Sequence, residues 1–241
     1  MTAQDDKNAT SLVQRVLKDP AIGEISFQMG DVSVSPTMYQ KVSQEIANGN
    51  IMVIVQPDVL KANEAGKYFR ELKLGNTTVF DVLVLRFPDL GDRSTPINEQ
   101  SHRIAAIVHE CTHAGFNVLK VPNMTNITHE SGAYIAQSIF VIAKMFAASA
   151  GHPERVHLDR VRMTDPIEKA AWDVAVMLHD EAASANTPAA RYYKSPDYAV
   201  KYWQTLSKVF TAISVSDEYK KIAKDKVKNV GVGRVIQQGG H

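Results

Sequence analysis

Residues 107–115 read IVHECTHAG, and the five central letters place His109, Glu110 and His113 on one expected helix. Residues four apart lie one turn apart on nearly the same face of an α-helix, so the imidazoles of His109 and His113 project in parallel. Tetrahedral zinc accepts two such nitrogens, each roughly 2 Å away, from one rigid helix. Glu110 projects in another direction, where it is left to act on a water. The spacing therefore predicts a metal-binding pair with an adjacent carboxylate base.

Apolar residues around the motif indicate how this helix is oriented. They recur at helical spacing on the side opposite the two histidines, at Ile104, Ile107, Val108, Cys111, Gly115 and Val118. We expect this side to pack on a core and the histidine side to border a cleft. Cys111 lies within the apolar stripe and is expected to be a small buried side chain, whereas His102 is expected to face solvent.

The next predicted helix, from about Thr128 to about Ala150, offers a third ligand. A catalytic zinc site takes three protein ligands and leaves the fourth position to water. Glu130 and His129 stand in the expected first turn, and a short turn-rich link predicts an antiparallel helix pair that brings Glu130 near the histidines. Glu130 is preferred, and His129, about 100° around the helix, is the alternative. Tyr134 would support the ligands from behind or pack in the core.

HECTH followed by a glutamate on the next helix resembles the gluzincin group of zinc metallopeptidases. The resemblance spans residues 104–137. It implies a zincin-like fold and a Zn²⁺ cofactor held by His109, His113 and Glu130. It also implies that Glu110 is the general base in the hydrolysis of peptide bonds.

Two departures place the chain away from the best-known relatives of this group. Thermolysin-like enzymes have an aspartate four residues after the third ligand, where this chain has Tyr134, and Phe116 and Leu119 replace the glycine and histidine of the metzincin pattern. The resemblance is therefore to a divergent gluzincin. In zincin folds the edge strand before the HExxH helix borders the cleft, and the stretch DVLVLRF, residues 81–87, resembles it in position. This implies a peptide or protein substrate recognised by strand addition.

The order of periodicities along the chain predicts an α+β fold. Short β-rich runs occur at residues 24–30, 31–35, 51–57 and 77–88. Helices are expected from Pro36, from about Ile97, from about Thr128, from Pro166, over 197–210 and over 216–228, before a glycine-rich and frayed end at 230–241. We predict one zincin-like domain over residues 1–241, composed of a β-rich part with a small mixed sheet (1–96), a metal-binding helix pair (97–150) and a mostly helical C-terminal part (151–241).

Composition argues against several kinds of partner. The formal net charge is +1, from 27 basic and 26 acidic residues, so no strong field favours nucleic acid or an anionic membrane. The most apolar stretch, residues 133–150, contains Gln137, Ser138 and Lys144, and we expect a buried helix and no membrane span. A single cysteine and the absence of a basic start before an apolar run predict a cytoplasmic protein, or one exported without an N-terminal signal peptide of the usual kind. The oligomeric state is left open.

Other interpretations of the same residues stay open. A catalytically silent zincin-like protein, acting as a metal-binding or protein-interaction module, needs the same ligands, and a purely structural protein needs no metal. The histidines would then be a surface pair, and Glu130 a first-turn acid favoured by the helix dipole. No spacing selects an oxyanion donor among His157, His179, Tyr192 and Tyr193.

Overall fold

The computed structural model divides the chain into two compact units. The residues that the structure describes are 2–91, 94–149, 163–185, 196–222, 224–227, 229, 231 and 237–238. The first unit comprises Met1–Ile22, Thr37–Val121 and Asn229–His241, and the second comprises Gly23–Pro36 and Pro122–Lys228. Helices and small sheets occur together, which confirms the predicted α+β class. The prediction of a zincin-like fold and the prediction of a single domain stay predictions.

The first unit is built around a small mixed sheet. Its strands are β3 (Met52–Val55), β4 (Gly66–Leu74), β5 (Thr77–Leu85) and β8 (Gln237–Gln238). The order is β3-β5-β4, with β3 parallel to β5, β4 antiparallel to β5, and β8 paired with the start of β5. The mixed sheet is as predicted. However, the strand that precedes the HECTH helix is central, so the prediction that residues 81–87 form the edge strand is wrong; among the described strands β3 and β4 stand at the two edges.

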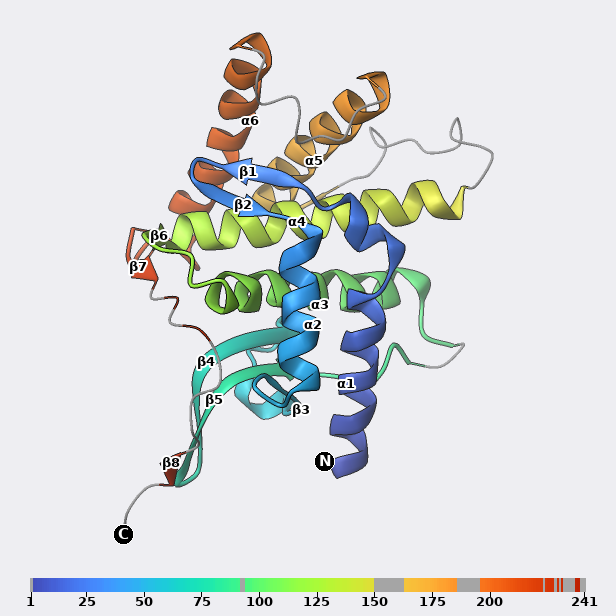
Figure 1. Cartoon of the computed structure of the whole chain (residues 1–241), viewed down its shortest axis with the longest axis vertical. Helices are drawn as coiled ribbons and strands as arrows, with labels where there is room; N and C mark the ends of the chain where they lie inside the picture. Colours follow the sequence, from blue (N-terminus) through green and yellow to red (C-terminus); the bar gives the residue numbers. More distant parts are fainter. Residues whose placement is uncertain are drawn as a thin grey trace. The chain divides into compact units, whose positions relative to one another are not determined.

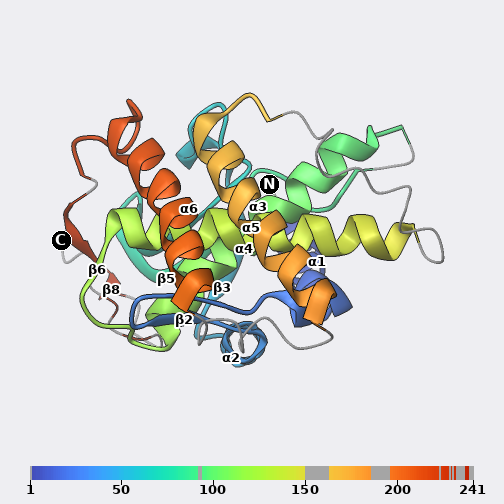
Figure 2. The ribbon, with the colours of Figure 1, turned by 90° about the horizontal axis from the view of Figure 1, so that it is seen from above.

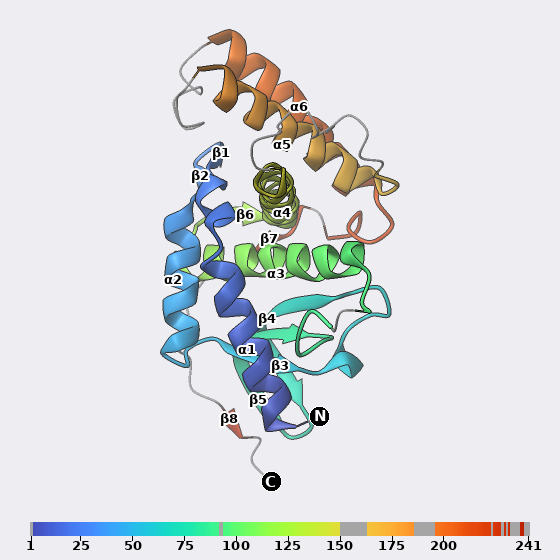
Figure 3. The same ribbon diagram turned by 90° about the vertical axis from the view of Figure 1, so that its right-hand side faces the viewer.

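Three helices and two short 3-10 turns complete the first unit. They are α1 (Ala3–Leu17), η1 (Pro20–Glu24), α2 (Pro36–Ala47), η2 (Pro57–Val59) and α3 (Ile97–Val118). Helix α3 packs against β4 and β5 (Figure 3). On the sheet, one apolar cluster joins η2 to the strands through Leu60, Leu72, Val79, Val82 and Val84.

Helix α2 crosses α3 at a point where α3 has no side chain (Figure 1). A Cβ added to Gly115 would lie 2.4 Å from Cγ of the buried Met38. One turn away, the Tyr39 hydroxyl bonds to Thr112 Oγ1 at 2.8 Å. The predicted start of α2 at Pro36 is confirmed. Glycine at position 115 therefore permits the close approach of the two helices.

Several elements of this unit were not predicted, namely α1, β4, the two 3-10 turns and β8, which lies in the stretch expected to be frayed. Helix α1 begins with a capping box in which Thr2 and Asp5 bond to each other's backbone N–H, and this backbone bond is the main cause of a lowered Asp5 pKa. Strand β4 contains four charged residues, as suits the edge of a sheet.

The second unit is mostly helical. It contains the hairpin of β1 (Phe27–Met29) and β2 (Val32–Val34), the pair of β6 (Met124–Thr125) and β7 (Lys226–Val227), and helices α4 (Asn126–Ala148), α5 (Pro166–Ala185) and α6 (Pro196–Val215). Helices α5 and α6 lie side by side and both contact α4 (Figure 2). The carboxylate of Asp165 caps α5, as its place before Pro166 predicts. The prediction of a helix over residues 216–228 is wrong, because the described residues there form turns and β7.

Helix α4 is, within the described residues, the one helix long and apolar enough to cross a membrane. It packs against α5 and α6, and its buried positions run from His129 to Ile142. A core helix has the same length and composition. The burial agrees with the predicted buried helix, and nothing else in the described residues has the character of a membrane span.

Candidate metal centre on helix α3

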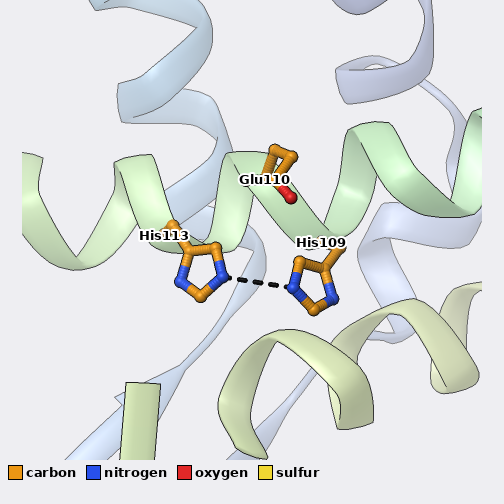
Figure 4. A group of neighbouring side chains, drawn as sticks. All are labelled: His109, Glu110 and His113. Carbon is orange, nitrogen blue, oxygen red and sulfur yellow. Dashed lines mark hydrogen bonds between the residues drawn. The ribbon is translucent and has the colours of Figure 1, made fainter. Parts of the chain in front are cut away.

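Helix α3 brings His109, Glu110 and His113 together. The Nε2 atoms of the two histidines are 3.1 Å apart, and one ligand atom from each of the three residues lies within 4.8 Å of the others. Both imidazoles project from the same side of α3 with these nitrogens turned toward each other (Figure 4). The rings meet edge to face, with centroids 4.9 Å apart. The predicted convergence of the two histidines is therefore observed.

The spacing of these nitrogens fits a zinc ion. With Zn–N bonds of about 2.0–2.1 Å and a tetrahedral angle, two ligand nitrogens stand about 3.3 Å apart. The observed 3.1 Å is close to that value. His109 and His113 are each only 8% exposed, so both rings, and a metal bound between them, would be largely shielded from water. Binding requires both Nε2 atoms to be unprotonated.

Glu110 is held by the edge of the sheet. The backbone N–H of Tyr68, on β4, donates to Glu110 Oε2 at 2.7 Å. Arg86 N–H donates to the Ala65 carbonyl, so the backbone of residue 65 faces β5. In an antiparallel pair the backbone groups of successive residues face the partner strand and the outside in turn. Tyr68, three residues after Ala65, therefore points its N–H away from β5 and toward the outside of the sheet. Gly66, on the same strand, would place an added Cβ 3.7 Å from Glu110 Cγ. The carboxylate thus lies at the outer edge of β4.

A buried polar cluster joins this edge to the next turn of α3. Tyr68 Oη donates to Asp81 Oδ1 at 2.9 Å, and Asn117 Nδ2 donates to Tyr68 Oη, Asp81 Oδ1 and the Gly231 carbonyl at 2.8, 3.0 and 3.1 Å. We call these four residues the Tyr68 cluster. Asp81 and Asn117 are fully buried. The cluster therefore ties β4, β5, α3 and the C-terminal segment to one another.

Asp81 adopts an unusual backbone conformation in the centre of the sheet. Its φ is +55°, which costs about 1 kcal/mol for a residue with a side chain, although aspartate tolerates it better than most. The pairing of β4 with β5 is interrupted only at Arg70 and Asp81. On β5, Val79 and Val82 belong to the same apolar cluster although they are three residues apart, where an undistorted strand would have a spacing of two. The distortion turns the Asp81 carboxylate toward Tyr68 and Asn117.

Both sides of α3 are buried around the motif, and the prediction that the histidine side borders a cleft stays a prediction. From Ile107 to Asn117 every residue is buried except the half-buried Glu110. Cys111 is buried and free, as predicted, and burial raises the pKa of its thiol. His102 is exposed, as predicted. The histidine pair is consequently not a surface pair.

Helix α4, in the second unit, carries the predicted third ligand. It begins at Asn126 with Thr125 as its N-cap, not at Thr128. Glu130 therefore lies beyond the first turn, which removes the helix-dipole explanation for its presence. Glu130 is half-buried and His129 is buried. The choice of Glu130 over His129 as a zinc ligand stays a prediction.

Tyr219, which sequence reasoning did not select, lies beside these residues of α4. Its side chain bonds to that of Tyr134, and Glu130 is close enough to act on both hydroxyls. Burial is the main cause of a raised pKa at Tyr134 and Tyr219, and the Glu130 charge adds to it. Tyr134 thus lies near both a carboxylate and a second phenol, and its role in supporting a metal ligand stays a prediction.

The predicted oxyanion donors are mostly outside the described residues. His157, Tyr192 and Tyr193 lie there. His179 is described, and its ring stacks on Phe146 with centroids 4.2 Å apart. That contact favours packing over catalysis for His179.

Comparison of the chain with family models, with curated proteins and with solved structures finds no match.

Proposed function

We propose that the protein is a zinc-dependent hydrolase of peptide bonds, related in design to gluzincins. His109 and His113 bind the metal, Glu130 is the third ligand with His129 as the alternative, and Glu110 is the general base. The observation that supports this most strongly is the 3.1 Å separation of the two buried Nε2 atoms, with the Glu110 carboxylate in the same group. Two imidazoles with the carboxylate of Glu130 as the proposed third ligand are a donor set that zinc accepts, and the Glu110 carboxylate lies beside the histidines as the proposed base.

Zinc, Glu110 and Tyr68 have different roles in the proposed hydrolysis. Bound zinc supplies Lewis acidity, which makes water a better nucleophile and a carbonyl a better electrophile. Glu110 accepts the proton from the attacking water and passes it to the leaving amine. The N–H of Tyr68 holds one carboxylate oxygen, Oε2, so that the base keeps one direction.

The edge of the sheet favours an extended peptide as substrate. No described strand pairs with the outer side of β4, and the alternation that turns the Tyr68 N–H outward also turns the backbone of Gly66 and Arg70 outward. A peptide can approach such an edge as a further strand beside Glu110, which itself accepts the outward N–H of Tyr68. The strand proposed for this role is therefore β4 in place of residues 81–87.

A catalytically silent metal-binding module is the second candidate. The bond between Glu110 and Tyr68 favours it, since the same contact would serve as a structural tie between α3 and β4. The two functions differ in the fourth metal position, which is open to water in a catalyst and closed in a structural site.

Replacement of Glu110 by Gln tests the proposed function. The variant should retain zinc and lose peptidase activity by about 10²–10⁴-fold, because only the base is removed. The measurement is hydrolysis of a quenched fluorescent peptide mixture by zinc-loaded protein, with zinc content determined on the same samples. His102→Ala, an exposed histidine of the same helix, is the matched control and should keep both properties. Undiminished activity in Glu110→Gln would refute the assignment.

A further inference from the structure

Tyr68 contacts the active-site helix at two separate points. Its backbone N–H binds Glu110 Oε2 at 2.7 Å, while its hydroxyl accepts from Asn117 Nδ2 at 2.8 Å. Glu110 and Asn117 are seven residues apart, which places them on nearly the same face of α3 and roughly 10 Å apart along its axis. The tyrosine therefore runs along the stretch of α3 that carries His113, with one end at the base and the other at Asn117.

The hydroxyl end of Tyr68 is anchored by two hydrogen bonds to one buried side chain. The hydroxyl donates to Asp81 Oδ1 at 2.9 Å, and Asn117 Nδ2 donates to the same oxygen at 3.0 Å. Asp81 and Asn117 are fully buried, so these bonds have no competition from water. Asp81 reaches this position by adopting a positive φ within a strand. Costly conformations of this kind persist where the surroundings hold them in place.

The near end of Tyr68 has no such support from the sheet. Its N–H points away from β5, so the β4–β5 pairing does not hold it. A small rotation of β4 would move this N–H away from Glu110 while the strand remained paired. The anchor at the hydroxyl end opposes that rotation.

We infer that Tyr68, Asp81 and Asn117 are positioning residues that set the direction of the Glu110 carboxylate by bracing β4 against α3. The consequence for catalysis rests on the proposed function, in which Glu110 is the base. The brace itself does not. It acts through the Tyr68 backbone, while the Tyr68 hydroxyl bonds to Asp81 and Asn117.

The brace is tested by hydrogen exchange of the backbone amide of residue 68, followed by NMR on the full chain without added metal. In the wild type this amide should exchange slowly, although it lies on a sheet edge. In Tyr68→Phe, which keeps the N–H and removes only the hydroxyl, exchange should be faster by about tenfold or more, because the bond to Glu110 is no longer held. Amides that pair β4 with β5, such as that of Arg86, should change little.

Two further variants make the test specific. Asp81→Asn replaces the carboxyl group by an amide but keeps a residue that tolerates positive φ, so it should act in the same direction with a smaller effect. Tyr39→Phe removes a different buried hydroxyl that bonds to α3, at Thr112, and should leave the residue 68 amide and the kcat unchanged. If Tyr68→Phe does not fold, Asp81→Asn provides the comparison.

Peptide hydrolysis by the zinc-loaded protein gives the second readout. Tyr68→Phe should lower kcat by about 10–100-fold with KM and zinc content nearly unchanged, because the base is displaced and the ligands are not. Equal exchange at residue 68 in wild type and Tyr68→Phe, or faster exchange with an unchanged kcat, would overturn the inference. A wild type with a protected amide and no hydrolysis would instead refute the proposed function and leave the brace standing.

Discussion

Helix α3 is tied to its neighbours on two sides, and each tie uses a tyrosine hydroxyl, that of the buried Tyr39 and that of the half-buried Tyr68. On the α2 side, Tyr39 bonds to Thr112, whose own hydroxyl donates to the Val108 carbonyl. On the β4 side, Tyr68 bonds to Asp81 and Asn117. The first tie joins neutral groups and sits in apolar packing, while the second contains a buried carboxylate and adjoins Glu110. A hydrogen bond from a tyrosine hydroxyl therefore does not by itself distinguish a packing role from the proposed positioning role; the partner of the hydroxyl and its neighbours do.

The largest difference between the two sides should appear in metal binding. His113→Ala removes one of two converging nitrogens and should lose stoichiometric zinc. Thr112→Val changes the adjacent residue, which bonds to Tyr39 on the α2 side, and this variant should retain zinc. Zinc content after dialysis against a weak chelator measures both. Equal zinc in the two variants would contradict the division of α3 into these two sides.

Packing against α2 should matter next, and only for stability. Gly115→Ala places a Cβ 2.4 Å from Met38 Cγ and should lower the free energy of unfolding by about 1–3 kcal/mol, measured in urea. Gly23→Ala meets nothing within 4 Å and is the matched control, with an expected change of less than about 0.5 kcal/mol. Zinc content should be normal in both. A stabilised Gly115→Ala would show that α2 and α3 are less closely packed than described.

Tyr39→Phe should cost about 1 kcal/mol near neutral pH, because it removes one hydrogen bond while Thr112 keeps its bond to Val108. Burial raises the Tyr39 pKa above its ordinary value of 10.0. The folded state then keeps the neutral phenol, so stability is unaffected below pH 10 and falls as the pH rises further, when unfolded chains ionise. Urea unfolding from pH 8 to 11 should show a steeper alkaline loss in wild type than in Tyr39→Phe. Parallel curves would contradict the burial of this hydroxyl.

The smallest effect is expected at Cys111. Its thiol is buried on the apolar side of α3, and burial raises its pKa, so a thiol reagent at pH 8 should not modify the folded protein. One thiol should react in denaturant. Rapid modification of the folded chain would show that this side of the helix opens.

The sequence predicted the elements whose signals are local. Helices α2 and α5 follow from Pro36 and from Asp165 before Pro166, at their first turns. Strand β4 was missed because its charged residues hide the period of two, as is common for an edge strand. Helix α1 was missed although Thr2 and Asp5 spell a capping box.

The same distinction holds for the site. His109, Glu110 and His113 were found because one helix sets their spacing. Tyr68 and Asn117 were not, because their contact joins segments far apart in the chain. Asp81 did leave a signal, as the single charge within the apolar run VFDVLVL, but its left-handed conformation depends on partners that no local pattern reveals.

X-ray absorption at the zinc edge of the metal-loaded protein tests whether His109 and His113 bind the metal. We expect one zinc per chain with two imidazole nitrogens at about 2.0–2.1 Å and carboxylate oxygen in the remaining shell. The imidazole signal should disappear when His109 and His113 are both replaced by Ala, and remain in His102→Ala. A shell without imidazole, or one that contains sulfur from Cys111, would contradict it.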